Sequence, residues 1–103
     1  YLFLIFELES PVVATNPRKQ TVFEGRTAQI NCTAKGIPRP ELSWTFENGK
    51  PPPGDAVIRN CSNQSTLQLS NTSKSMEGWY TCKAKNKGGV TFSNSTLHVL
   101  GLF

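Results

Sequence analysis

Histidine and methionine are nearly absent from this sequence, which contains one of each, His98 and Met76. A catalytic nucleophile needs a base within hydrogen-bond reach, and no serine or cysteine motif accompanies His98. Structural zinc needs four ligands at close spacing, whereas His98 and Cys61 together would supply two. We therefore expect no enzyme, no metal site and no cofactor.

Long hydrophobic runs and strong net charge are also missing. Residues 1–6 are apolar, but the run ends at Glu7, and a membrane-spanning helix needs about 20 residues. We expect membrane contact only through segments of a parent protein outside this chain. The net charge is +4, from 11 Lys and Arg against 7 Asp and Glu. No basic run is long enough to indicate a nucleic-acid site.

The length of 103 residues predicts one domain. The chain begins with Tyr1, so we interpret it as a fragment or a processed piece of a longer protein. Residues 1–10 are expected to be a leader or linker: the remnant of a signal peptide, the end of a preceding segment, or an artefact of the gene model. The domain itself is expected over residues 11–100, and residues 101–103 would begin a further linker.

Alternation of apolar and polar residues is the main structural signal. It runs through residues 28–34, 42–46 and 80–84, and a period of two is typical of a strand with one buried and one solvated face. Asn48-Gly49 is a strong hairpin signal. Short strands separated by turns, with no helical period of any length, favour an all-β sandwich.

Two of the three cysteines, Cys32 and Cys82, lie on inward-facing positions of their strands and are 50 residues apart. They would come from different sheets, and a bridge between them, covered by the inward-facing Trp44, would fill a thin core. Closing such a loop contributes about 4 kcal/mol in the chain-entropy model. Leu69 and Tyr80 join the predicted core, with the Tyr80 hydroxyl placed to bind a backbone group.

The positions that carry a family pattern are Glu24-Gly25, Cys32, Gly36-x-Pro38-x-Pro40, Trp44, Leu67-x-Leu69, Gly78-x-Tyr80-x-Cys82-x-Ala84-x-Asn86-x-x-Gly89 and Leu97-x-Val99. Over about residues 11–100 this pattern resembles the immunoglobulin superfamily, and within it the intermediate (I-set) domains. The resemblance implies a two-sheet Greek-key β-sandwich with strands A, A′, B, C, C′, D, E, F and G. It also implies an inter-sheet disulfide, Cys32–Cys82.

The chain departs from this family at one position. Four residues before the corner tyrosine these domains usually carry an aspartate that pairs with a basic residue, and this chain has Met76 followed by Glu77. Either Glu77 takes over the ion pair or Met76 closes the base of the core.

Asn-X-Ser/Thr sites are unusually frequent, and they stand at Asn31, Asn60, Asn63, Asn71 and Asn94. They accept N-glycans only in a secreted chain, where a disulfide also persists. A chain rich in Asn, Ser and Thr forms some such triplets by accident, yet we favour an extracellular or cell-surface location. Cys61 remains unpaired, as a free thiol, as the partner of another chain or domain, or as an adventitious residue.

Lysines occupy every second position at Lys83, Lys85 and Lys87. One interpretation is charge pairing with Glu41 and Glu47 on a neighbouring strand of a solvated face. The other is a contact face for an acidic protein or a sulfated glycan, with Phe92 and Val90 beside the lysines, since interfaces favour aromatic anchors.

The resemblance implies a non-catalytic protein-recognition module of a cell-adhesion molecule, a cell-surface receptor or a matrix protein, with a homophilic or heterophilic protein partner. Two alternatives stay open. One is a structural spacer in an extracellular or sarcomere-type scaffold. The other is the ligand-binding ectodomain of a receptor kinase or phosphatase.

Overall fold

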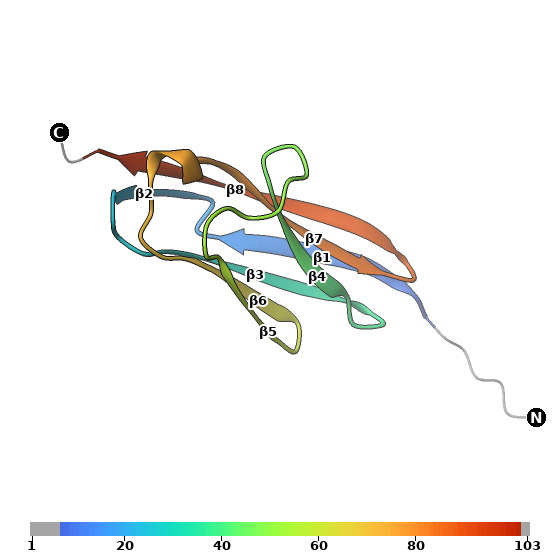
Figure 1. Ribbon diagram of the computed structural model, residues 1–103. Helices are drawn as coiled ribbons and strands as arrows, with labels where there is room; N and C mark the ends of the chain where they lie inside the picture. Colours follow the sequence, from blue (N-terminus) through green and yellow to red (C-terminus); the bar gives the residue numbers. More distant parts are fainter. Residues whose placement is uncertain (1–6, 102–103) are drawn as a thin grey trace, which may run out of the picture.

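The computed structural model describes residues 7–101 as two packed β-sheets with one short 3-10 helix (Figure 1). The elements are β1 (Glu9–Asn16), β2 (Lys19–Phe23), β3 (Ala28–Ile37), β4 (Glu41–Phe46), β5 (Val57–Cys61), β6 (Gln64–Leu69), η1 (Lys74–Met76), β7 (Gly78–Asn86) and β8 (Gly89–Leu100). Within the described part, no helix has the length and hydrophobicity needed to cross a bilayer. The interpretation of residues 1–10 as a leader falls largely on residues 1–6, which lie outside the described residues.

Each sheet has four strands, in the orders β1-β3-β6-β5 and β2-β8-β7-β4. Neighbouring strands are antiparallel except β2, which runs parallel to β8. The chain passes from the first sheet to the second between β1 and β2, so the first two strands lie on different sheets (Figure 1). The all-β sandwich expected from the alternating pattern is confirmed.

The core lies between the sheets and is centred on the predicted disulfide. Cys32 of β3 and Cys82 of β7 are bonded at an S–S distance of 2.00 Å, which confirms the bridge expected across the sheets. Trp44, Leu69 and Tyr80 are buried around it, with 5%, 1% and 0% of their surface exposed. Their burial follows from period-two alternation, which sends every second side chain of a strand to the same face.

Tyr80 closes one end of the core. Its hydroxyl donates a hydrogen bond to the backbone carbonyl of Met76, at 2.5 Å, in the last residue of η1. Its ring packs against Phe46, with 4.8 Å between ring centroids. Burial raises the pKa of the Tyr80 phenol well above its ordinary value, and the nearby carboxylate of Glu47 adds to the shift. The phenol therefore keeps its proton, and with it the hydrogen bond to Met76, into the alkaline range.

The segment between β4 and β5 differs from the implied strand C′. Among the described residues it forms only a single bridge, from Phe46 to Lys50. Pro51, Pro52 and Pro53 follow, and proline cannot donate to a strand ladder. Glu47, expected on the outer side of its strand, instead begins the turn with a left-handed φ of 54°. The hairpin turn at Asn48-Gly49 starts one residue earlier than the pattern indicated.

Candidate contact surface

The outer side of the β2-β8-β7-β4 sheet carries most of the predicted contact residues. In the β7–β8 pairing Lys83 lies opposite Phe92 and Lys85 lies opposite Val90, with no bulge to shift the register. Phe92 and Val90 are 59% and 45% exposed. β7 therefore contributes lysines, and β8 contributes large apolar side chains, to one solvated surface on which they lie side by side.

Lys87 does not lie on this strand face. β7 ends at Asn86, and Lys87 follows in the β7–β8 turn, where it is exposed. The Asn86 side-chain amide donates to the carbonyl oxygens of Glu9 (2.7 Å) and Pro38 (2.8 Å), and its oxygen accepts from the Gly88 N–H (2.7 Å). These bonds hold the turn against two other chain segments. Because Lys87 lies in this turn, the lysine stripe on β7 consists of Lys83 and Lys85.

Trp79 is the residue of this surface that sequence reasoning missed. It lies on β7, four positions before Lys83, and is 53% exposed. The sequence nevertheless predicts that Trp79 is exposed, because its neighbour Tyr80 points inward and successive side chains of a strand point to opposite faces. We call the surface formed by Trp79, Lys83, Lys85, Val90 and Phe92 the lysine–aromatic face.

The sheet register brings one lysine of this face opposite a carboxylate. Glu41 of β4 lies directly opposite Lys85 in the sheet register, as the pairing interpretation requires. Over residues 7–101, however, the contacts between carboxylates and basic side chains both end on Glu77, from Lys74 and from His98. Lys83 and Lys85 thus form no ion pair among the described residues, and both interpretations of these lysines stay predictions.

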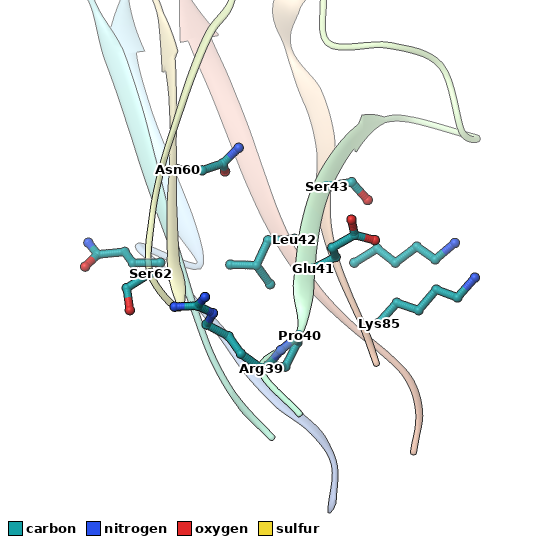
Figure 2. A pocket seen from close by; sticks show the side chains of 10 residues that line it. Arg39, Pro40, Glu41, Leu42, Ser43, Asn60, Ser62 and Lys85 are labelled. Carbon is teal, nitrogen blue, oxygen red and sulfur yellow. The ribbon is translucent and has the colours of Figure 1, made fainter. Parts of the chain in front are cut away.

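A groove adjoins the lysine–aromatic face where the two sheets part. It lies between β4 and the β5–β6 hairpin and encloses about 810 Å³. Figure 2 shows Leu42 and Asn60 directed into it, with Arg39 crossing toward Ser62 at one end and Lys85 beyond β4. β4 and β5 are edge strands, and an edge strand presents unpaired backbone groups to a partner. The groove thus extends the available polar surface around the edge of the sheet.

Glu77 organises a second polar cluster at the base of the sandwich. Its carboxylate accepts from the Val99 backbone N–H (2.9 Å) and from the Lys74 ammonium (3.2 Å), and it contacts His98 Nδ1 (2.5 Å). The bond from Val99 is the main reason that the pKa of Glu77 lies below its ordinary value. Glu77 thus does form an ion pair in place of the missing aspartate, but the pair lies at the surface. The described residues contain no group of three potential metal ligands.

The five sequon asparagines differ in exposure. The side chains of Asn60, Asn63, Asn71 and Asn94 are exposed. Asn31 is half-buried, and its Oδ1 accepts a hydrogen bond from the Thr66 hydroxyl (2.8 Å). Their modification remains a prediction.

The third cysteine, Cys61, ends β5 and has an exposed free thiol. Its role, as a free thiol, as the partner of another chain or domain, or as an adventitious residue, stays a prediction.

Comparison with known proteins identifies the family. The chain belongs to the immunoglobulin domain family, whose sequence model matches residues 10–86. It is 36% identical over 86 residues to hemicentin-2 of Mus musculus, a match that covers 82% of this chain and 2% of that protein. It is 33% identical over 94 residues to vascular endothelial growth factor receptor 3 of Danio rerio, covering 91% of this chain and 7% of the receptor.

Solved structures give the same result. A chimeric titin Z1Z2 structure superimposes with a TM-score of 0.83 at 26% identity, covering 93% of this chain and 99% of that one. The expected immunoglobulin-like sandwich of the I-set type is confirmed. An immunoglobulin domain is a non-catalytic module, and this chain spans only a few per cent of the two curated relatives named above.

Proposed function

We propose that this chain is an extracellular protein-recognition module that binds its partner through the lysine–aromatic face. The observation that carries the proposal is the pairing of Lys83 with Phe92, a positive charge without a carboxylate partner beside a ring that is 59% exposed. Aromatic side chains are typical anchors of protein interfaces, and unneutralised charges steer a complementary partner toward its site. The expected partner surface is acidic with an apolar centre, on a protein or a sulfated glycan.

The extracellular location is supported by the disulfide together with the sequons. Four of the five sequon asparagines have exposed side chains, as N-glycosylation requires. Three of them, Asn60, Asn63 and Asn71, lie on or next to β5 and β6, in the other sheet or its connections. The similarity to a growth factor receptor agrees with a place in a cell-surface protein, of the adhesion or receptor type.

The principal alternative is a spacer module in a scaffold such as titin, whose Z1Z2 structure this chain matches. A spacer predicts no exposed aromatic side chains beside unpaired charges. An intracellular scaffold also predicts bare sequons and reduced cysteines.

Mass spectrometry of the protein from its native source separates these possibilities. We expect N-glycans that a glycosidase releases, and a mass increase of two hydrogens when Cys32–Cys82 is reduced. Bare sequons together with reduced cysteines in native material would refute the extracellular placement.

The contact face is tested by staining cells of the source organism with fluorescent tetramers of this chain. The fluorescence bound to the cells measures the interaction with the partner. Lys83→Glu/Lys85→Glu is expected to reduce cell staining about tenfold or more, because like charges replace the attraction. The matched control is Lys35→Glu/Lys50→Glu, which changes the net charge equally at exposed positions on β3 and in the β4–β5 segment. Equal loss in both variants would show nonspecific charge attraction and contradict a defined face.

A further inference from the structure

We infer that Asn94 carries an N-linked glycan whose first sugar, N-acetylglucosamine, packs on the exposed rings of Trp79 and Phe92. The inference rests on the proposed extracellular function, because only a secretory chain receives such a glycan. It assigns an occupant to Trp79 and to the side of Phe92 that faces Asn94, and it leaves the lysines, Val90 and the other side of Phe92 to the protein partner.

The register of β7 and β8 brings the three residues together. Phe92, Asn94 and Thr96 occupy alternate positions of β8, so their side chains lie on one face, about 7 Å apart from one to the next. Trp79 lies opposite Thr96 and is therefore the diagonal neighbour of Asn94, at about 7–8 Å. Asn94 thus stands between two rings, one on its own strand and one on the strand beside it.

The surface between these rings is hollowed. Trp79, Phe92, Asn94 and Thr96 contribute to the walls of a depression of about 390 Å³, with Arg18 and Lys19 from the β2 side. This volume is within the range of small-ligand sites, about 300–1,000 Å³. The first sugar joined to Asn94 would already lie inside the depression. Its packing there therefore requires no ordering of a long connecting chain.

The Asn94 side chain is held so that its amide nitrogen remains available. The Thr81 hydroxyl, directly across the strand pair, donates to Asn94 Oδ1 at 2.7 Å. In glycan transfer, Nδ2 forms a bond to C1 of the sugar of a lipid-diphosphate-linked oligosaccharide. The C1–O bond to the diphosphate breaks, the lipid diphosphate leaves with the bonding electrons, and Nδ2 gives up one proton. The amide oxygen is unchanged, so the Thr81 contact persists and holds the linkage above the sheet.

The chemistry of the rings suits a sugar. The face of an aromatic ring is electron-rich, and the C–H groups on one side of a pyranose ring provide the matching positive edge. Trp79 and Phe92 are also large apolar surfaces that a secreted protein would otherwise leave in water. Phe92 forms the border between the two halves: its side toward Asn94 meets the sugar, and its side toward Lys83 stays with the contact surface.

Tryptophan fluorescence tests this packing, because Trp44 is buried and Trp79 is the exposed indole. The full chain is secreted from animal cells behind a signal peptide and trimmed enzymatically to a single N-acetylglucosamine at each site. We expect acrylamide quenching of the accessible tryptophan to be about twofold weaker than in Asn94→Gln, since one ring face is covered. Asn60→Gln, which removes an exposed sequon on β5, is the matched control and should leave quenching unchanged.

Thermal unfolding provides a second readout. Asn94→Gln is expected to lower Tm by about 4 °C, and the shift should vanish when Phe92→Ser and Trp79→Ser are already present. A sugar at Asn94, verified by mass spectrometry, with unchanged quenching and unchanged Tm would overturn the inference alone. A bare Asn94 beside glycans at other sites would also overturn it alone. Native material with bare sequons and reduced cysteines would instead refute the extracellular function on which it rests, whereas bare sequons in oxidised material would overturn the inference alone.

Discussion

The indole N–H of Trp44 donates a hydrogen bond to the hydroxyl of Ser65 at 2.9 Å, across the space between the two sheets. Trp44 lies on β4 and Ser65 on β6, and Ser65 is paired directly with Cys32 in the β3–β6 register. The bond therefore holds the indole beside the disulfide and satisfies the one polar atom that Trp44 brings into the core. A buried donor of this kind is costly to leave without an acceptor.

Removing the acceptor should destabilise the domain. Ser65→Ala leaves the Trp44 N–H buried without a partner, and we expect a loss of about 1–3 kcal/mol in the free energy of unfolding. Urea denaturation followed by fluorescence measures it. Ser70→Ala, at an exposed position just after β6, should change stability by less than about 0.5 kcal/mol. An unchanged urea midpoint in Ser65→Ala would mean that the indole finds another acceptor.

Tyr80→Phe separates the hydroxyl from the ring. The ring contact with Phe46 is retained, while the bond to the Met76 carbonyl is lost, at an expected cost of about 1 kcal/mol at pH 7.

The pH dependence of the same variant follows from linkage. Because burial raises the pKa of Tyr80 in the folded state, the folded chain retains a proton that the unfolded chain releases near pH 10. The stability from this residue is complete below about pH 10 and declines as the pH rises further. Wild type should therefore lose stability above pH 10 more steeply than Tyr80→Phe. Parallel alkaline curves would argue against a buried phenol.

Glu77 should make the domain sensitive to acid. Its pKa is lowered, chiefly by the Val99 N–H, so its contribution is present above about pH 4.3, the ordinary value, and is lost as the pH falls through the folded-state value. Glu77→Gln keeps an oxygen acceptor for Val99 but removes the charge. The urea midpoint of wild type should fall more between pH 6 and pH 3 than that of Glu77→Gln. Glu24→Gln, in the exposed β2–β3 turn, serves as control and should follow wild type.

Reducing the disulfide should remove a large part of the stability. The Cys32–Cys82 bridge closes a sequence separation of 50 residues, which corresponds to about 4 kcal/mol in the chain-entropy model. We expect reductant to lower the urea midpoint accordingly, both in wild type and in Cys61→Ser. In the native oxidised protein a maleimide should label one thiol, Cys61, which is exposed. Labelling of more than one thiol would show that the bridge is incomplete.

Local patterns were sufficient for the strands and the core. Alternation at Ile30, Cys32 and Ala34 predicted which side chains are buried, because every second side chain of a strand lies on the same face. The same rule placed Lys83 and Phe92 on the outside. The same rule applies to Trp79, which lies next to the inward-facing Tyr80 and is exposed.

Local patterns failed where the backbone changes direction. Glu47 continues the alternation of its strand, yet it begins a turn with φ 54°, and Lys87 lies just beyond the end of β7. Strand ends depend on the next turn and on contacts from other segments, such as the Asn86 bonds to Glu9 and Pro38. The alternation of apolar and polar residues along a strand contains no information about these contacts or about where the strand ends.

The sequence by itself thus determined the sandwich, the Cys32–Cys82 bridge and the family, because alternation, cysteine parity and a spaced set of core residues are local or one-dimensional features. Only the tertiary structure decided which residues are neighbours. Ser65 accepts a hydrogen bond from Trp44, Val99 donates one to Glu77, and Asn94 lies between Trp79 and Phe92. These relationships join β4 with β6, β8 with the residue that precedes β7, and β8 with β7. Their distances are set by sheet register and sheet packing, which depend on the whole chain at once.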